Sequence, residues 1–348
     1  MEKLGKTKWW SVDNDVNNLI EDDSIVEAAQ LLQQNEVVAF PTETVYGLGG
    51  NAYSDEAINK IFAAKGRPTD NPLIIHIYSQ EQLNEIVASV PKVAKQLIET
   101  FWPGPLTLIL PKGKQVSERA TAGLKTVAVR MPNHPVALAI LERANIPIAA
   151  PSANRSGKPS PTTAKHVIAD LNDKIAGVVD GGRTGIGVES TVVQIDGENV
   201  TILRPGGITR EQIETIIGKC HVHESVLTDI HSPQSPGMKY THYAPLAPLY
   251  VVYGNEHRLH EWIAKERAKG HRVGILTTTE NVNAYKADRV LACGSRSELS
   301  TVAEQLYATL RQFDRENVDV IISESFPKEG IGVAIMNRLE KAATKMIV

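Results

Sequence analysis

The segment Lys65-Gly66-Arg67-Pro68-Thr69-Asp70-Asn71-Pro72-Leu73-Ile74-Ile75-His76 places two cations one residue apart, between a helical pattern and an apolar strand. The helical pattern covers residues 57–64 and the strand pattern covers residues 73–77. The inner positions of the helix are Ile58, Ile61 and Phe62. An Arg guanidinium can donate two parallel hydrogen bonds to phosphate oxygens, and a Lys ammonium adds a compact positive charge. Lys65 and Arg67 therefore suit a polyphosphate. Two cations on a solvated surface are the alternative, because charged side chains are mostly exposed.

Apolar runs on both sides of this segment predict a domain over residues 1–217 that mixes helices with a sheet. A capping-box pattern from Ser24 to Glu27 opens a helix that runs to about Gln34. The inner face of this helix carries Ile25, Ala28, Ala29 and Leu32. The strand candidates are residues 37–40, 73–77, 106–110, 127–130, 146–150, 178–179, 191–195 and 200–203. The turn Asp196-Gly197-Glu198-Asn199 makes the last two strands a hairpin, so the sheet is at least partly antiparallel.

The pattern changes after residue 217. Residues 218–247 are rich in proline and histidine and lack a sustained period, which predicts an ordered linker or lid. Strand and helix patterns then alternate over residues 248–348, which predicts a small parallel, Rossmann-like α/β domain. Its strands are 249–253, 273–276 and 318–322, and its helices are 256–269, 299–313 and one from about residue 333. It has no G-x-G-x-x-G or G-x-x-x-x-G-K-[ST] motif, so no motif marks it as a nucleotide site.

Composition argues against a protein that grips nucleic acid mainly through its phosphates. The formal net charge is −3, from 37 Lys+Arg against 40 Asp+Glu, and no basic run is present. The two cysteines, Cys220 and Cys293, lie far apart and fit no zinc spacing, which favours a reducing interior. No apolar run approaches the roughly 18 residues of a membrane span. We therefore expect a cytoplasmic protein without stable nucleic-acid or membrane binding.

Polar residues gather at five other strand ends of the first domain. Residues 41–50 and 151–163 are hydroxyl- and glycine-rich loops that follow strands, where open α/β sheets place ligands. Arg130 and Arg204 each end an alternating strand, and residues 185–191 lead into another. Each feature alone has a structural alternative: a capped turn, a surface loop or a solvated strand tip. Together they favour an anion site at this edge of the sheet.

Four motifs, PTETVYGLG, KGRPTDNPLIIH, PSAN and ESTVV, occur in this order and resemble the YrdC-like threonylcarbamoyl-AMP synthases. The signature of that family joins a K-x-R pair to an S-x-N pair, which here are Lys65, Arg67, Ser152 and Asn154. The similarity covers residues 20–215. The segment SPGMKYTHYAP (235–245) and the added α/β domain resemble the longer, two-domain members. The resemblance implies a YrdC-like catalytic domain with a twisted mixed sheet, followed by a Rossmann-like C-terminal domain.

The activity that the resemblance implies is that of a nucleotidyltransferase. L-threonine, bicarbonate or CO2 and ATP would give threonylcarbamoyl-AMP and pyrophosphate. The product would pass to a transferase that makes N6-threonylcarbamoyladenosine at position 37 of tRNA. Mg²⁺ would accompany ATP, held mainly by phosphates and water rather than by a protein metal site.

The resemblance also implies two groups of site residues. Lys65 and Arg67 would act on the triphosphate as the catalytic pair. The full ATP group is Lys65, Arg67, Asn71, Thr126, Ser152, Asn154, Ser160, Arg204 and Tyr243. The L-threonine group is Thr44, His76, Arg130, Ala150 and Ser190, with Arg130 facing the substrate carboxylate. Tyr243 would close over the nucleotide as part of a lid, and the alternative is a linker that only separates two domains.

Three other interpretations compete with this one. An RNA-binding module would suit a concave α/β surface, but the acidic balance and the 5% aromatic content oppose it. Carbamoyl transfer in hydrogenase maturation uses a related domain, but the cysteine-rich zinc motifs of that assembly are absent from the sequence. A metal site at Cys220, His221 and His223 lacks a fourth ligand at a plausible spacing.

Overall fold

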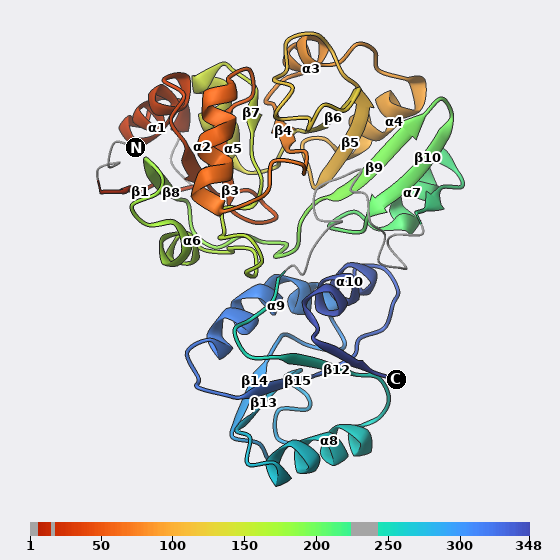
Figure 1. Cartoon of the computed structure of the whole chain (residues 1–348). Coiled ribbons are helices and arrows are strands. Elements are labelled where there is room, and N and C mark those ends of the chain that lie inside the picture. The colour runs from red at the N-terminus through yellow and green to blue at the C-terminus, as the bar shows by residue number, and fades with distance from the viewer. Residues whose placement is uncertain (1–5, 15–17, 224–242) are drawn as a thin grey trace. The chain divides into compact units, whose positions relative to one another are not determined.

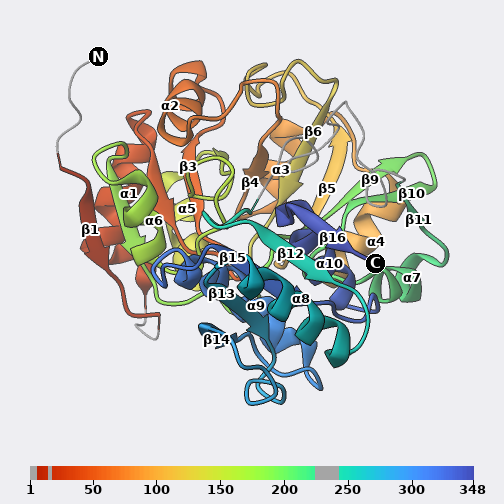
Figure 2. The same ribbon diagram turned by 60° about the horizontal axis from the view of Figure 1, so that its bottom comes forward.

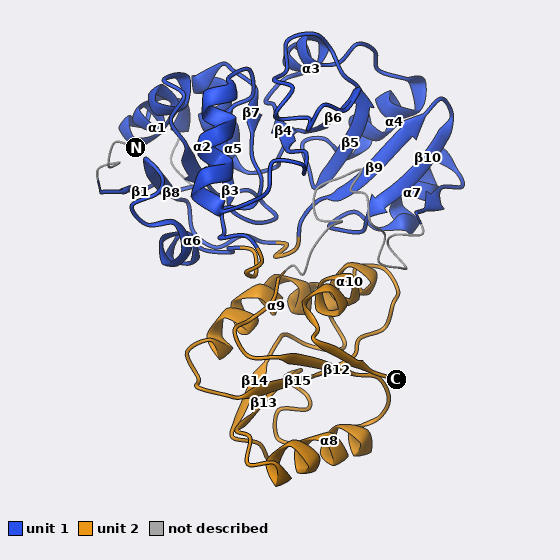
Figure 3. Ribbon diagram, viewed as in Figure 1, with its two compact units in different colours: residues 1–156, 161–185, 189–239 blue, residues 157–160, 186–188, 240–348 orange. Residues whose placement is uncertain are grey.

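The computed structural model describes residues 6–14, 18–223 and 243–348, which fall into two compact units (Figure 3). The first unit comprises residues 1–156, 161–185 and 189–239, and the second comprises 157–160, 186–188 and 240–348. The two short segments at 157–160 and 186–188 thus group with the C-terminal part of the chain. Most of the predicted linker, residues 224–242, lies outside the described residues.

In the first unit the described residues form one 11-stranded sheet with helices on it (Figure 1). The strand order is β1-β8-β2-β3-β7-β4-β6-β5-β9-β10-β11. The strands are β1 (Lys8–Ser11), β2 (Val38–Phe40), β3 (Gly47–Asn51), β4 (Ile74–His76), β5 (Leu106–Pro111), β6 (Thr126–Arg130), β7 (Ile148–Ala149), β8 (Gly177–Asp180), β9 (Thr191–Asp196), β10 (Asn199–Arg204) and β11 (His221–Val222). The helices are the 3-10 turn η1 (Leu19–Glu21), α1 (Asp23–Gln33), α2 (Asp55–Lys65), α3 (Gln80–Ile86), α4 (Lys92–Phe101), α5 (Pro135–Ala144), α6 (Ala164–Leu171) and α7 (Arg210–Ile217).

The sheet is mixed, as predicted. The pairs β2–β3, β5–β6 and β9–β10 are antiparallel, whereas β4–β6, β5–β9 and β1–β8 are parallel. Asp196 pairs with Asn199, which confirms the predicted hairpin. Parallel pairing of β4 with β6 makes His76 the register partner of Arg130. The register therefore brings the ends of two predicted polar strands to one edge.

Two apolar clusters hold these elements together. One packs α1 and α5 against β2 through Ile25, Leu32, Phe40 and Ile140, all inaccessible to solvent. The other covers α2, α4 and the strands β4, β5 and β6. Helices α4 and α7 pack against each other beside β9 and β10 (Figure 1, Figure 2). Both clusters follow the 3.6- and 2-residue periods of the sequence, which is why the inner faces of α1 and α2 were predictable.

Helix α1 begins differently from the prediction. The N-cap is Asp22, whose carboxylate accepts hydrogen bonds from the backbone N–H groups of Ser24 and Ile25. The expected capping box from Ser24 to Glu27 is wrong, because the Glu27 carboxylate instead accepts from Trp10 Nε1 at 2.7 Å and binds Lys8. Asp22 satisfies the exposed N–H groups of the first turn just as a capping box would.

The second correction concerns residues 41–50, expected to form a polar loop throughout. Residues Gly47–Asn51 form strand β3, which pairs with β2 on one side and β7 on the other. A Cβ at Gly49 would lie 2.6 Å from Phe40 Cε1 and 2.9 Å from Ile148 Cγ2. Glycine therefore lets the side chains of two neighbouring strands lie across β3.

The second unit is a parallel sheet with helices on both faces (Figure 1). Its strand order is β14-β13-β15-β12-β16, and each neighbouring pair among the described residues is parallel, which confirms the predicted Rossmann-like layout. The strands are β12 (Leu249–Val252), β13 (Val273–Thr277), β14 (Arg289–Ala292), β15 (Val320–Glu324) and β16 (Lys345–Ile347). Helix α8 (Glu256–Ala268) covers one face, and α9 (Leu299–Phe313) and α10 (Gly332–Ala342) cover the other. Strands β14 and β16 had no clear sequence signal.

None of the helices in the described ranges is both long enough and apolar enough to cross a membrane.

Candidate active site

Lys65 is the last residue of α2 and lies almost entirely out of contact with solvent, with 2% of its surface exposed. The left-handed C-cap Gly66, at φ 61°, turns the chain directly after it. The Lys65 ammonium donates to the backbone oxygens of Ser152 and Asn154, the latter at 2.8 Å, and lies 3.3 Å from Asn154 Oδ1. Lys65 of the K-x-R pair therefore contacts both residues of the S-x-N pair. The surface alternative is wrong for Lys65, because its charge is buried against polar oxygens.

Arg67, Asn71 and Thr126 lie at the same end of strands β4 and β6. Arg67 Nη2 is 3.5 Å from the carbonyl oxygens of both Asn71 and Pro72. The parallel register of β4 and β6, continued by two residues, puts Thr126 beside Pro72. Asn71 is 1% exposed, and its Oδ1 has no hydrogen-bond partner among the described residues. A buried acceptor of this kind is suited to a bound water or a ligand donor.

The loop after β7 carries Ser152 and Asn154. Ser152 Oγ donates to Asn154 Oδ1 at 2.6 Å, and Ser152 forms an isolated antiparallel bridge with Gly47 of β3. Ala153 N–H donates to the Tyr46 carbonyl at 2.8 Å. Backbone hydrogen bonds therefore join the two loops that were predicted to be polar, residues 41–50 and 151–163. Ala150 precedes this loop, and its N–H donates to the Ile74 carbonyl at 2.9 Å, so it lies between the two groups of site residues.

The second group centres on Arg130 at the end of β6, which is 3% exposed. Its Nη1 donates to Thr44 Oγ1 at 3.0 Å and its Nε donates to the Gly104 carbonyl at 3.2 Å. Its Nη2 lies 2.5 Å from Glu43 Oε2 in an ion pair. Thr44, His76 and Arg130, which were predicted from separate motifs, therefore lie together. Glu43 was not predicted, although its place beside Thr44 in a polar loop was a usable signal.

Two buried histidines flank this ion pair. Burial, reinforced by the charge of Arg130, lowers the pKa of His76 to about 3. Burial also lowers the pKa of His134 to about 4, although the negative charge of Glu43 opposes that shift. His134 is the N-cap residue of α5, and its Nδ1 has no hydrogen-bond partner within the described ranges. His134 was not predicted, since one histidine before a helix carries no distinctive pattern.

Ser190 and Arg204 form a third buried cluster. Arg204 donates from Nε and Nη2 to the Ser190 carbonyl at 3.1 and 2.9 Å, and from Nη2 to Ser190 Oγ at 3.1 Å. Thr107 Oγ1 and Ser190 Oγ share a hydrogen bond of 2.8 Å. Ser190, which was predicted to bind L-threonine, and Arg204, which was predicted to bind ATP, are therefore direct neighbours. Thr107 is a member of this cluster that the motifs did not mark.

Ser160 and Tyr243 belong to the second unit. Tyr243 is buried, with φ 66°, and stacks on Tyr307 of α9 at a centroid distance of 5.3 Å. The Arg338 guanidinium of α10 lies 5.6 Å from the Tyr243 ring. Ser160 is fully buried within a short segment grouped with the same unit. Their participation in a nucleotide site with the residues of the first unit stays a prediction.

A surface hollow of about 310 Å³ lies apart from these clusters, beside helices α3 and α4. Its lining includes Gln80, Leu83, Lys95 and Ile98, and it contains none of the predicted site residues.

Comparison with known proteins decides the family. The family model Sua5_yciO_yrdC, described as telomere recombination, matches residues 30–206. A second, described as threonylcarbamoyl-AMP synthase, C-terminal domain, matches residues 208–344. The chain is 56% identical over 344 residues to the threonylcarbamoyl-AMP synthase of Bacillus subtilis (strain 168), with 99% of each chain covered. The chain belongs to the threonylcarbamoyl-AMP synthase family.

Further members of this family extend the match to structure. The threonylcarbamoyl-AMP synthase of Pyrococcus abyssi is 47% identical over 338 residues, covering 96% of this chain and 98% of the relative. The crystal structure of P. abyssi Sua5 complexed with L-threonine matches with a TM-score of 0.92 at 45% identity, covering 98% of this chain and 100% of that one. The predicted resemblance, the two-domain form and the α/β fold are therefore confirmed.

Proposed function

We propose that this chain synthesises threonylcarbamoyl-AMP from L-threonine, bicarbonate or CO2 and ATP, with release of pyrophosphate. The observation that carries the proposal is the burial of the Lys65 ammonium against Ser152 and Asn154, so that the signature residues of the family converge. The full-length identity to a relative of that name supports it.

The ATP end of the site is built around Lys65 and Arg67. The carbonyl oxygens at Ser152 and Asn154 hold the Lys65 ammonium in one place. A positive charge that is already oriented and partly shielded from water stabilises phosphate charge without a cost of reorganisation. Arg67 Nη2 lies 3.5 Å from the Asn71 carbonyl oxygen, and Asn71 Oδ1 is a buried acceptor without a hydrogen-bond partner among the described residues.

Mg²⁺ is expected to enter with ATP, bound by phosphate oxygens and water. Asn71, whose buried Oδ1 has no hydrogen-bond partner among the described residues, is the side chain here that would help to hold the hydrated ion. The ion would neutralise charge on the phosphates as pyrophosphate departs.

The threonine end is built around the ion pair of Arg130 and Glu43. A free amino acid carries one positive and one negative group, and this pair matches both. The Arg130 guanidinium would bind the carboxylate, and Glu43 Oε1, which has no hydrogen-bond partner among the described residues, would accept from the amino group. Neutral His76 and Thr44 would hydrogen-bond the side-chain hydroxyl. Such contacts reject analogues without a hydroxyl more strongly than an apolar pocket would.

The reaction itself needs positioning more than covalent catalysis by the protein. The neutral amino group of threonine forms an N–C bond to CO2, one C=O bond of which opens to a carboxylate while the nitrogen loses a proton to solvent, and this gives N-carboxy-threonine. If bicarbonate supplies the carbon, its C–OH bond breaks and water leaves. A carboxylate oxygen of that intermediate then forms a bond to the α-phosphorus of ATP, and the bond from this phosphorus to the bridging oxygen of pyrophosphate breaks. Holding the two reactants together contributes through proximity and charge stabilisation.

The product carries an activated acyl phosphate and requires an acceptor. We expect a transferase that acts on adenosine 37 of tRNA to receive it, and this places the expected activity in the cytoplasm. The chain itself would need no stable hold on RNA, which agrees with its net charge of −3.

The test is an incubation of the full chain with α-labelled ATP, L-threonine, bicarbonate and Mg²⁺, each omitted in turn, with products separated by chromatography and identified by mass. We expect labelled threonylcarbamoyl-AMP and pyrophosphate only when threonine and bicarbonate are both present. Labelled AMP that forms equally without threonine would overturn the proposal and indicate simple ATP hydrolysis. Salt-sensitive tRNA binding without any turnover would instead support the RNA-binding alternative.

A further inference from the structure

The parallel sheet of the second unit has a topological switch point between β13 and β15. From β13 the chain continues to β14, its neighbour on one side. From β15 it continues to β16, which lies on the other side, beyond β12. These two strands are neighbours, so their following connections diverge. Open parallel α/β sheets bind ligands at the carboxyl ends of such strands, where the diverging connections leave a crevice.

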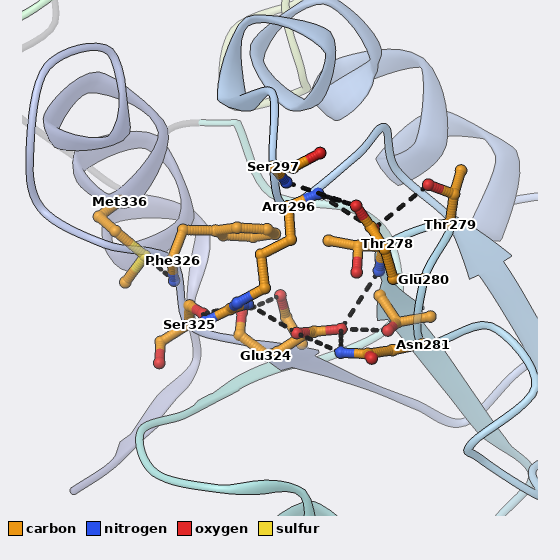
Figure 4. A network of polar contacts seen from close by, with 12 residues as sticks. Thr278, Thr279, Glu280, Asn281, Arg296, Ser297, Glu324, Ser325, Phe326 and Met336 are labelled. Atoms are coloured by element: carbon orange, nitrogen blue, oxygen red, sulfur yellow. Dashed lines mark hydrogen bonds and ion pairs between the residues drawn. The ribbon is translucent and has the colours of Figure 1, made fainter.

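The carboxyl ends of these two strands carry a polar network (Figure 4). Glu324 ends β15 and is 5% exposed. Its carboxylate accepts from Thr278 N–H at 3.2 Å, from Asn281 Nδ2 at 3.3 Å and from Arg296 Nη1 at 2.8 Å. Thr277 Oγ1 makes a further, very short hydrogen bond to it. Both carboxylate oxygens of Glu324 therefore have hydrogen-bond donors. The bond from Arg296 Nη1 fixes the position of that guanidinium at the switch point.

Beside this network, donors of residues 295–297 hold the carboxylate of exposed Glu280. It accepts from Ser295 Oγ at 2.5 Å, from Arg296 N–H at 2.9 Å and from Ser297 N–H at 3.4 Å. These hydrogen bonds hold the pKa of Glu280 far below its usual range. The donors belong to the turn that precedes α9, so backbone amides before a helix already bind an anion that the chain itself supplies.

Thr278 gives the second, independent observation. Its side chain is fully buried, and its Oγ1 has no hydrogen-bond partner in the part of the chain that the structure describes. Figure 4 shows this side chain projecting into the network, between Glu280 and Glu324 in that view. A buried hydroxyl without a partner destabilises the fold, and such a group calls for an explanation, of which a missing ligand is one.

We propose that the carboxyl edge of β13 and β15 binds a phosphate group of a small molecule, which displaces the Glu280 side chain. Arg296 is exposed enough to bind an incoming anion, with 42% of its side-chain surface accessible. The amides of Arg296 and Ser297, the Ser295 hydroxyl and the Thr278 hydroxyl supply the other donors. A phosphate presents three oxygens to these groups, whereas the Glu280 carboxylate presents only two.

Charge explains why displacement is part of the proposal. Glu280, Arg296 and Glu324 together carry one negative charge, so an additional anion would be repelled. If the Glu280 side chain swings into solvent, the phosphate replaces one anion by another in the same cradle. Glu280 acts in this way as an internal competitor that sets how much phosphate is needed. The proposal does not depend on the activity of the first unit.

Peptide-resolved hydrogen–deuterium exchange of the full chain, with and without inorganic phosphate at constant ionic strength, tests it. We expect phosphate to slow exchange in peptides that cover residues 277–281 and 294–299. Protection confined to peptides around 65–71 and 152–154 would overturn this inference while supporting the catalytic site. Protection of residues 277–281 and 294–299 alone would support this inference and leave the proposed synthesis to its own turnover assay. Equal exchange rates of these peptides in phosphate and in chloride of the same ionic strength would also overturn it.

Two substitutions sharpen the test. Glu280→Gln removes the competing charge and should lower the phosphate concentration for half-protection about tenfold. The matched control is Glu298→Gln, which makes the same charge change on a neighbouring exposed residue. Equal shifts in the two variants would point to general electrostatics and overturn the displacement.

Thr278→Val separates binding from stability. In the absence of phosphate it should raise the midpoint of thermal unfolding by about 2–4 °C, because an unsatisfied hydroxyl is replaced by a methyl group of similar size. It should also weaken phosphate protection of residues 294–299. The control Thr309→Val removes a hydroxyl that donates to the Gln305 carbonyl at 3.0 Å, and it should stabilise nothing and leave protection unchanged. A Thr278→Val variant with undiminished protection would contradict the proposal.

Discussion

His76 and Arg130 are register partners at the ends of the parallel strands β4 and β6, and both side chains are buried. Burial and the neighbouring guanidinium charge lower the pKa of His76 to about 3, so the imidazole is neutral at neutral pH. His76 Nδ1 lies 3.3 Å from the Ile74 carbonyl, which favours the tautomer with the proton on Nδ1. Nε2 is then an acceptor, as a partner for a substrate hydroxyl must be.

Acid should destabilise the fold through this histidine. The unfolded chain binds the proton near pH 6.5 and the folded chain only near pH 3, so the free energy of unfolding falls as the pH drops through that window. His76→Gln should reduce the loss between about pH 7.5 and 4.5 by up to about 3 kcal/mol. Urea unfolding at both pH values measures this. His257→Gln, at an exposed position of α8, should leave the slope unchanged, and an equal effect there would refute the assignment to His76.

Removing the Lys65 charge should strongly reduce synthesis and also lower stability, because buried oxygens of Ser152 and Asn154 lose their donor. Lys65→Met keeps the length of the side chain but leaves the ATP end without its oriented ammonium, and we expect at least about a hundredfold loss of turnover. Lys60→Met is the control on the same helix, since Lys60 pairs with Glu36 and Glu56 on the surface. Turnover measures the loss of synthesis, and circular-dichroism melting measures whether the variants remain folded. Comparable turnover in the two variants would show that the Lys65 charge is not needed for the reaction.

Glu43→Gln should raise the KM for L-threonine far more than the KM for ATP. The substitution leaves the shape of the loop but removes the charge that pairs with Arg130 and that would receive the amino group. It also leaves a buried guanidinium without its ion pair, which costs about 3–5 kcal/mol of stability. Steady-state kinetics with each substrate varied in turn distinguishes the two effects. Equal changes in both KM values would indicate a structural role alone.

Tyr243→Ala should weaken ATP binding if the tyrosine serves the nucleotide site as predicted. The ring also stacks on Tyr307, so the variant should lose stability of about 3 kcal/mol as a buried aromatic is truncated. Tyr243→Phe retains the stack and separates packing from the hydroxyl. Calorimetric titration with ATP is the measurement. Unchanged affinity in Tyr243→Ala would reduce this residue to a structural contact of the second unit.

Much of this architecture could be predicted because apolar periodicity reports burial. The helix over 299–313 and the inner face of α1 follow directly from the spacing of their apolar residues. Strand β3 could not be predicted in the same way. Glycines carry no apolar side chain, so the strand has no apolar period, and it is held by pairing with β2 and β7. The glycine at position 49 leaves the space that Phe40 and Ile148 occupy.

The sequence by itself determined which residues are the candidates for the chemistry: the K-x-R and S-x-N motifs, and the arginines at two strand ends. Only the tertiary structure decided their partners. Glu43 lies next to Thr44 in the chain, yet its significance depends on Arg130, which is brought beside it by the end of β6. Strand order likewise decides which donors surround the Glu324 and Glu280 carboxylates. Burial and charge pairing are properties of neighbours in space, and a one-dimensional pattern records only neighbours along the chain.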